Sequence, residues 1–265
     1  MIRSVAMPPP SAAGAEPPVA RRLADPAHVA ARFVDRAGVE QEGAWLETAG
    51  QCRLEDCLPV RLFPALKGRR VAPGWFWSAT NGHLVHYGSR AMRTQLMLLD
   101  HDPRVVALAC RPVELLWRGR RGRLVAHAPH LMARLADGSG LLLDCVGRTG
   151  AGLRLVRRAM HVEAAAAAAG WHYRLVGPPP QVVEANVRWL AGYRHPRCAG
   201  SWLPAVAECF SLPRPLIEGV RLLGGALTVW PAVLHALWTG LLSASLHEAL
   251  SERAVAVTAQ TGAGR

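Results

Sequence analysis

The stretch that decides the fold is HAPHLMARLADGSGLLLDCVG, residues 127–147. It contains two apolar, β-prone runs on either side of Ala136-Asp137-Gly138-Ser139-Gly140. An Asp-Gly pair between two such runs is typical of a short hairpin loop. The stretch therefore predicts two antiparallel strands joined by a tight turn.

The segments around this hairpin predict an α/β protein with one mixed sheet. Before it, residues 89–101 form a helix that ends at Asp102-Pro103, and residues 105–119 form a buried strand that bends at Pro112 into a second strand. After it, residues 153–169 form a helix closed by Gly170, and residues 171–177 alternate as a strand does. Residues 124–135 are taken as a single strand, the first of the hairpin.

Composition shifts divide the chain into four segments. Residues 1–57 are a disordered or irregular N-terminal segment, in which residues 31–57 form at most a short helix or strand that packs on the next domain. Residues 58–177 are the α/β domain, and the prolines at 178–180 mark its end. Residues 181–250 form a helical, winged-helix-like domain, and residues 251–265 are a tail with β-prone character.

The charge of the chain favours acidic partners. The formal net charge is +12 and the sequence pI is about 10.8, so nucleic acid is the first candidate, although a genome rich in Arg and Ala codons gives the same balance. Two basic groups flank turns and are the candidate DNA contacts, with solubilising surface as the alternative: Lys67, Arg69 and Arg70, and then Arg118, Arg120, Arg121 and Arg123.

Cysteine spacing and hydropathy predict a cytoplasmic protein with no membrane contact. The six cysteines form no CxxC pair, which favours reduced, mostly buried thiols over a zinc site. The first twenty residues lack the unbroken apolar core of a signal peptide. The most apolar stretch, residues 224–246, is interrupted by Pro231 and is expected to hold a buried helix rather than a membrane span.

A hairpin that follows a helix suits metal-dependent cleavage of a phosphodiester, because carboxylates from both can converge on one magnesium ion. Such a site needs an acid on the preceding helix, an acid after a Pro at the start of the hairpin, and an acid late in its second strand with Lys two residues later. In this chain His130 follows Pro129, and Asp144 is followed by Val146. No acid stands between Trp75 and Asp100.

Five blocks carry a resemblance to a known family: residues 73–89, 96–118, 127–140, 170–177 and 186–197. Over residues 58–246 the chain resembles the TnsA-like endonuclease subunits of heteromeric transposases. The resemblance implies a restriction-endonuclease-like domain, a helical C-terminal domain, and joint action with a separate transposase subunit and an ATPase regulator. It also implies magnesium-dependent nicking of DNA at the transposon's 5′ ends.

The family's catalytic positions fall on altered residues here. Its tyrosine-acid-serine pattern puts one acid on Gly88, its helix acid falls on Met92, its metal-binding Asp on His130, and its late acid and Lys on Asp144 and Val146. Asp144 and His130 are thus the candidate catalytic residues, Asp144 is the candidate metal ligand, and Mg²⁺ is the cofactor only if the site is active.

Two functions stay open, a residual nuclease and a non-catalytic adaptor that binds DNA or a partner, with a functionless remnant as a third.

Smaller expectations concern single residues. His127 and His130, three apart in one strand, should point to opposite faces and not bind one ion together. Asp100 and Asp102 are explained by the end of a helix and a turn. Glu114 should face solvent. Trp75 and Trp77 share one face of a strand, which favours core packing over base stacking.

Overall fold

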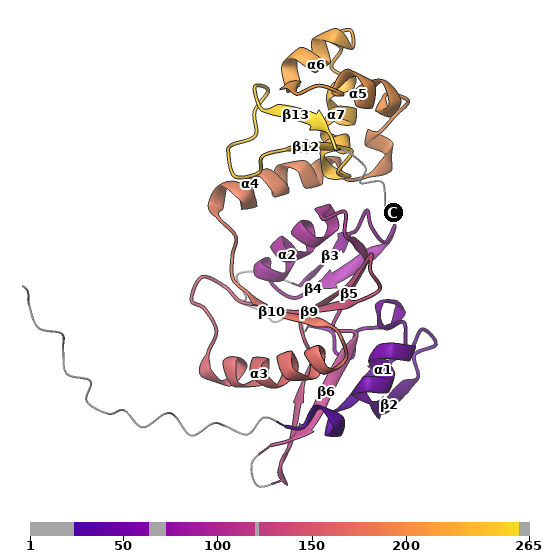
Figure 1. The fold of residues 1–265 in the computed structure, drawn as a ribbon, viewed down its shortest axis with the longest axis vertical. Helices are drawn as coiled ribbons and strands as arrows, with labels where there is room; N and C mark the ends of the chain where they lie inside the picture. The colour runs from indigo at the N-terminus through magenta and orange to yellow at the C-terminus, as the bar shows by residue number, and fades with distance from the viewer. Residues whose placement is uncertain (1–23, 64–72, 120–121, 260–265) are drawn as a thin grey trace, which may run out of the picture.

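A computed structural model describes residues 24–63, 73–119 and 122–259. In this part of the chain the protein is a mixed α/β structure with two four-stranded sheets, one small three-stranded sheet and one separate two-stranded hairpin. Figure 1 shows the helical C-terminal part at one end of the molecule, the sheet with β5, β9 and β10 in the middle, and the sheet with β2 and β6 toward the other end. The α/β class predicted from the sequence is confirmed, but the strands do not form one sheet.

The central sheet contains the predicted hairpin and has the order β10-β9-β8-β5. Strand β8 is antiparallel to both β5 and β9, and β10 runs parallel to β9. The hairpin loop includes Gly138, whose φ of 86° suits glycine. The strands are β5 (Val105–Cys110), β8 (Leu131–Leu135), β9 (Gly140–Cys145) and β10 (His172–Val176).

Two helices cover opposite faces of this sheet. Helix α2 (Arg90–His101) packs on the face that carries Leu131 and Leu143, and α3 (Leu153–Ala168) packs on the face that carries Met132 and Leu142. Alternate residues of a strand point to opposite faces, so each helix buries its own set. The sequence-predicted ends hold as well: Ser89 Oγ caps α2 by accepting from Met92 N at 3.2 Å, and α3 ends before Gly170.

The second large sheet, with the order β2-β1-β6-β7, is antiparallel throughout. For residues 24–57, the described part of the predicted irregular segment, it corrects the prediction, because β1 pairs with β6 and Trp45 is fully buried, donating from Nε1 to Ala165 O at 2.7 Å. The α/β part therefore does not begin at residue 58. Its elements are η1 (Pro26–His28), β1 (Ala30–Val34), β2 (Glu40–Ala44), α1 (Trp45–Gln51), η2 (Leu54–Asp56), β6 (Val113–Arg118) and β7 (Leu124–His127).

The chain crosses between the two sheets twice, and both crossings meet at one place. The run 124–135, predicted as one strand, divides into β7 of one sheet and β8 of the other, with Pro129 between them. The run 105–119 is likewise divided at Arg111 into β5 of the central sheet and β6 of the second sheet. Arg111 is the only non-glycine of the described residues with positive φ (46°). Arg111 N donates to His130 O at 3.2 Å, which ties the crossings together.

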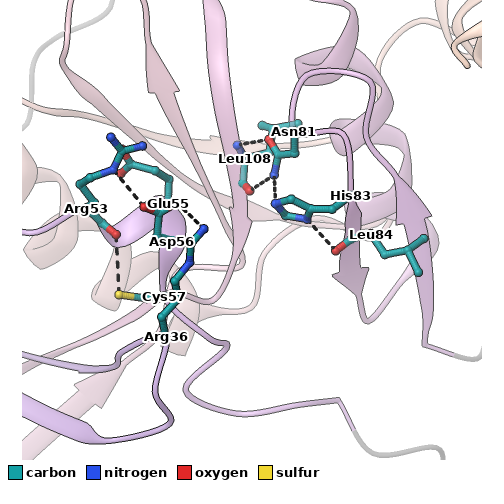
Figure 2. Close-up of polar contacts among 9 residues, drawn as sticks. All are labelled: Arg36, Arg53, Glu55, Asp56, Cys57, Asn81, His83, Leu84 and Leu108. Atoms are coloured by element: carbon teal, nitrogen blue, oxygen red, sulfur yellow. Dashed lines mark hydrogen bonds and ion pairs between the residues drawn. The ribbon is translucent and has the colours of Figure 1, made fainter. Parts of the chain in front are cut away.

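A separate hairpin of β3 (Gly74–Trp77) and β4 (Leu84–Tyr87) is held onto the central sheet by its turn. Figure 2 shows Asn81 in this turn binding both backbone groups of Leu108: its Nδ2 donates to Leu108 O at 2.7 Å, and its Oδ1 accepts from Leu108 N at 2.9 Å. Asp100, at the end of α2, accepts from Ser78 Oγ at 2.5 Å and from Ala79 N at 3.0 Å. The expected local turn role holds for Asp102, whose Oδ1 accepts from Arg104 N at 3.0 Å, whereas Asp100 lies inside α2 and binds the turn of the separate hairpin instead.

The C-terminal part packs on α2 through α4 and shares one continuous hydrophobic core with the central sheet. Strand β13 pairs with β12 and β11, so residues 255–258 belong to this part, and the predicted tail at 251–265 starts too early. The elements are α4 (Gln181–Leu190), η4 (Ala191–Tyr193), η5 (Pro196–Cys198), α5 (Leu203–Cys209), β11 (Arg214–Pro215), α6 (Leu216–Leu222), α7 (Val229–Trp238), β12 (Leu242–Ala244) and β13 (Val255–Thr258).

Two sequence predictions on solvent and redox state can be checked against this fold. None of the helices within the described ranges has the length and apolar character needed to span a membrane, and the most apolar of them, α7, is buried. All six cysteines are free thiols. Cys110 and Cys145 are buried and the other four are half-buried.

Candidate functional site

Asp144 lies at the centre of the candidate site and is completely buried. Its Oδ2 accepts from His127 Nε2 at 2.6 Å and from Tyr173 Oη at 2.8 Å. Burial acts to raise the pKa of Asp144, but the hydrogen bonds from His127 and Tyr173 and the electrostatic interactions with both histidines together outweigh it, so the pKa lies below the ordinary value and the carboxylate is ionised. Burial, together with this carboxylate, raises the pKa of Tyr173, which therefore stays a donor.

His130 lies on the other oxygen of the same carboxylate. Its Nδ1 is 3.4 Å from Asp144 Oδ1, yet it accepts a hydrogen bond from Cys145 N at 2.9 Å. Burial lowers the pKa of His130, and the nearby Arg111 lowers it further, so the ring is neutral and its proton is on Nε2. His130 Nδ1 and Asp144 Oδ1 are therefore both acceptors and make no hydrogen bond with each other. Asp144 Oδ1 has no donor among the described residues.

The expected separation of the two histidines is therefore wrong. His127 ends β7 and His130 precedes β8, so the alternation rule for a single strand does not apply to them. The chain turns at Pro129, and both imidazoles come to opposite oxygens of Asp144. His127 is thus a site residue that the sequence reasoning named but set aside.

Phe63 fills the position where the family resemblance implies an acid. A Cβ at Gly88 would lie 2.2 Å from the Phe63 ring, so that ring occupies the space of any side chain there. Its centroid is 6.5 Å from that of His130, and the Arg111 guanidinium carbon lies 3.7 Å from the ring centroid. Met92, the second expected acid position, is buried in the core.

Val146, the position where the resemblance implies a Lys, lies one residue beyond the end of β9 and has an uncharged side chain. Its backbone N donates to Val176 O at 2.9 Å. Phe63 had no signal in the sequence, because nothing local in residues 58–63 indicates that a ring there reaches Gly88.

Glu114, the nearest other acid, is not free to help Asp144. The prediction that it faces solvent is wrong: it is buried, at 4% exposure, and Arg61 Nη2 lies 2.9 Å from its Oε1. Arg32 adds a second ion pair at 3.6 Å. A carboxylate that neutralises two guanidinium groups is a poor candidate for a metal ligand.

The residues present do not fit a magnesium ion. Magnesium requires near-octahedral oxygen ligands and is bound through carboxylates that remain available to it. Here Asp144 Oδ2 is taken by His127 and Tyr173, and Glu114 is taken by arginines. The one oxygen left, Asp144 Oδ1, faces His130 Nδ1 at 3.4 Å, so a single carboxylate oxygen remains where several are needed. Within the part of the chain that the structure describes, no three His, Cys, Asp or Glu side chains are grouped as a metal site would need.

A basic groove of about 1200 Å³ runs beside this cluster, between the β6–β7 hairpin and the first half of α3. We call it the arginine groove. His127 and His130 lie in its wall, and Glu114 is the acidic residue that lines it. Six arginines line it: Arg61, Arg111, Arg123, Arg154, Arg157 and Arg158.

Most of these arginines have no anionic partner. Apart from Arg61, none makes a hydrogen bond or ion pair through its side chain with another described residue, and the buried Arg111 Nε has no acceptor. Burial lowers the pKa of Arg158, and the neighbouring Arg154 lowers it further. This much uncompensated positive charge makes the groove attractive to anionic groups.

The predicted DNA contacts are only partly visible. Arg123 lines the arginine groove, and Arg118 donates from Nη1 to Gly122 O at 3.0 Å near the hairpin tip. Lys67, Arg69, Arg70, Arg120 and Arg121 lie outside the described residues. The sequence reasoning missed the helix arginines 154, 157 and 158, although their spacing of three and four places them on one helical face.

Comparison with known proteins adds no family to this geometry. No family model matches the chain, and no curated protein is similar to it.

Proposed function

We propose that this protein is a DNA-binding subunit of the TnsA-like kind that holds DNA without metal-dependent cleavage. The observation that carries the proposal is the pairing at Asp144: a fully buried carboxylate bound to His127 and Tyr173 beside a groove in which five of six arginines have no side-chain hydrogen bond or ion pair among the described residues. The site has the charge to hold phosphates and lacks the oxygens to hold magnesium.

The topology supports this assignment. A helix, α2, precedes the hairpin β8–β9, and α3 and β10 follow it, with a helix on each face of a mixed sheet. His130 stands at the start of the hairpin and Asp144 near its end, as a restriction-endonuclease-like fold requires of its two hairpin positions. Helices α5, α6 and α7 with the sheet β11-β13-β12 are consistent with a winged-helix-like second part.

Arg111 takes the electrostatic role that a metal has in an active nuclease. Its guanidinium rests on Phe63, next to His130, and lines the arginine groove. A positive φ at a residue with a side chain is strained and persists where the surroundings impose it, here between Cys110 and Pro112. A phosphate beside Arg111 is attracted by a fixed charge, but it meets no metal-activated water.

The first test is DNA binding as a function of salt, by fluorescence anisotropy on a duplex. We expect affinity to fall by several orders of magnitude between about 50 and 200 mM salt. Arg158→Ala and Arg154→Ala should each weaken binding and reduce the slope of log K against log salt by about 1. Arg221→Ala, an exposed arginine on α6, is the matched control and should leave the slope unchanged. Equal slopes for all variants would overturn the groove assignment.

The second test is plasmid nicking with Mg²⁺ or Mn²⁺, with and without the transposase subunit and ATPase regulator that the family implies. We expect DNA binding with no nicking in any combination. Nicking that Asp144→Ala abolishes would establish the alternative, a residual nuclease, and refute the proposal. Binding that is lost together with nicking would instead indicate a remnant without function.

A further inference from the structure

One face of the β3–β4 hairpin is aromatic and open to solvent. Trp75 pairs with His86 and Trp77 with Leu84 across the hairpin, so these four side chains share a face, while Phe76 points into the core. Trp75 is 58% exposed and Leu84 is 53% exposed. The expectation that Trp75 packs in the core is therefore wrong.

The exposed ring of Trp75 packs against a row of tilted rings, with interplanar angles of 51° to His86 and of 35° between His86 and Phe63. Its centroid is 4.8 Å from that of His86, and the His86 centroid is 5.6 Å from that of Phe63. His86 is itself buried, and its pKa is lowered by burial and by Arg111, so it is a neutral ring between two others. A large aromatic surface fixed in this way loses little conformational freedom when a second ring stacks on it.

This row of rings ends at the arginine groove. Phe63, its innermost ring, lies under the Arg111 guanidinium and close to His130, and both of those residues line the groove. Arg111 thus links the groove to the inner end of this row of rings, and Trp75 stands at its outer end. Trp77, two residues further along β3, stacks on His195 with ring centroids 4.6 Å apart.

We propose that Trp75 is a stacking platform for an unpaired base of the DNA strand held in the arginine groove. The proposal rests on the proposed function, because the groove must first hold DNA. A paired base inside a duplex already stacks on its neighbours, so only a single-stranded end or an extruded base offers its face to Trp75. The chemical class of the ligand is thus a nucleobase next to a duplex end, with little sequence preference.

The test compares a blunt duplex with the same duplex carrying a short single-stranded overhang, by anisotropy at fixed salt. Wild-type protein should bind the overhang form roughly 5- to 150-fold more tightly, which is the range for stacking one base on an aromatic side chain. Trp75→Ala should remove this preference and leave blunt-duplex affinity unchanged. Trp75→Phe should keep most of it. Trp189→Ala, a 41% exposed tryptophan on α4, is the control and should keep all of it.

The outcomes separate the two proposals. If neither duplex binds in a salt-dependent way, the proposed function fails. If both bind and Trp75→Ala keeps the wild-type preference, the stacking proposal fails while the groove assignment stands. The stacking proposal is also overturned if Trp75→Ala changes only the binding of a protein partner, because the aromatic face is then a protein interface.

Discussion

Replacing His127 by Ala tests whether Asp144 is held as a buried anion. The carboxylate is fully buried and has two donors, His127 Nε2 at 2.6 Å and Tyr173 Oη at 2.8 Å. Removing one partner of a buried, hydrogen-bonded charge pair typically costs about 3–5 kcal/mol, because the remaining charge is uncompensated. We expect a loss of this size in the free energy of unfolding, measured by urea titration at neutral pH.

The double variant His127→Ala with Asp144→Asn gives the decisive comparison. It removes the stranded charge, so it should be more stable than His127→Ala alone. Tyr173→Phe removes only one hydrogen bond to the carboxylate and should cost about 1.5–3 kcal/mol. A loss below about 1 kcal/mol for His127→Ala, which is no more than an ordinary neutral hydrogen bond contributes, would refute the reasoning. So would a double variant no more stable than the single. Asp144 would then be available to a cation.

Three further outcomes are expected from the same geometry. Gly88→Ala should destabilise the protein by about 1–3 kcal/mol, because its Cβ would lie 2.2 Å from the Phe63 ring; in a Phe63→Ala background the cost should largely vanish in the same urea titration. The folded-state pKa of Asp144 is depressed, so its stabilisation is present above the unfolded pKa of about 3.9 and is lost as pH falls through the folded value. Wild type should therefore show a loss of stability on acidification that Asp144→Asn lacks, and parallel pH profiles would contradict this. Asn81→Ala should cost about 1–3 kcal/mol and speed hydrogen exchange at the Leu108 amide, which loses its acceptor at 2.9 Å; unchanged exchange would show that the turn does not hold the sheet.

Elements with local signals could be predicted from the sequence. Helix α2 has a Ser cap and a Pro after its end, α3 ends before a glycine in the left-handed region, and the β8–β9 loop contains Asp-Gly. Each of these signals lies within a few residues of the structure that it specifies. The same is true of Asp144, whose place late in β9 follows from the strand alternation.

Features that depend on distant contacts could not be predicted. Strand β2 is short, charged and exposed, so its sequence lacks the apolar alternation typical of a strand. It is a strand because its backbone pairs with β1. The burial of Glu114 depends on Arg61 and Arg32, and the position of Phe63 depends on the empty space at Gly88. The division of residues 124–135 between two sheets depends on β6, because β7 pairs with β6 and not with a strand of the central sheet.

The pairing of β1 with β6 has a consequence for synthesis of the chain on the ribosome. Strand β1 ends at Val34, and its central partner begins only at Val113. At about 5–20 residues per second, the nascent strand waits roughly 4–16 s for that partner, with one backbone edge unsatisfied. The glutamates at positions 40 and 42 on β2 cover the other edge with charge, which opposes pairing with neighbouring nascent chains during this delay.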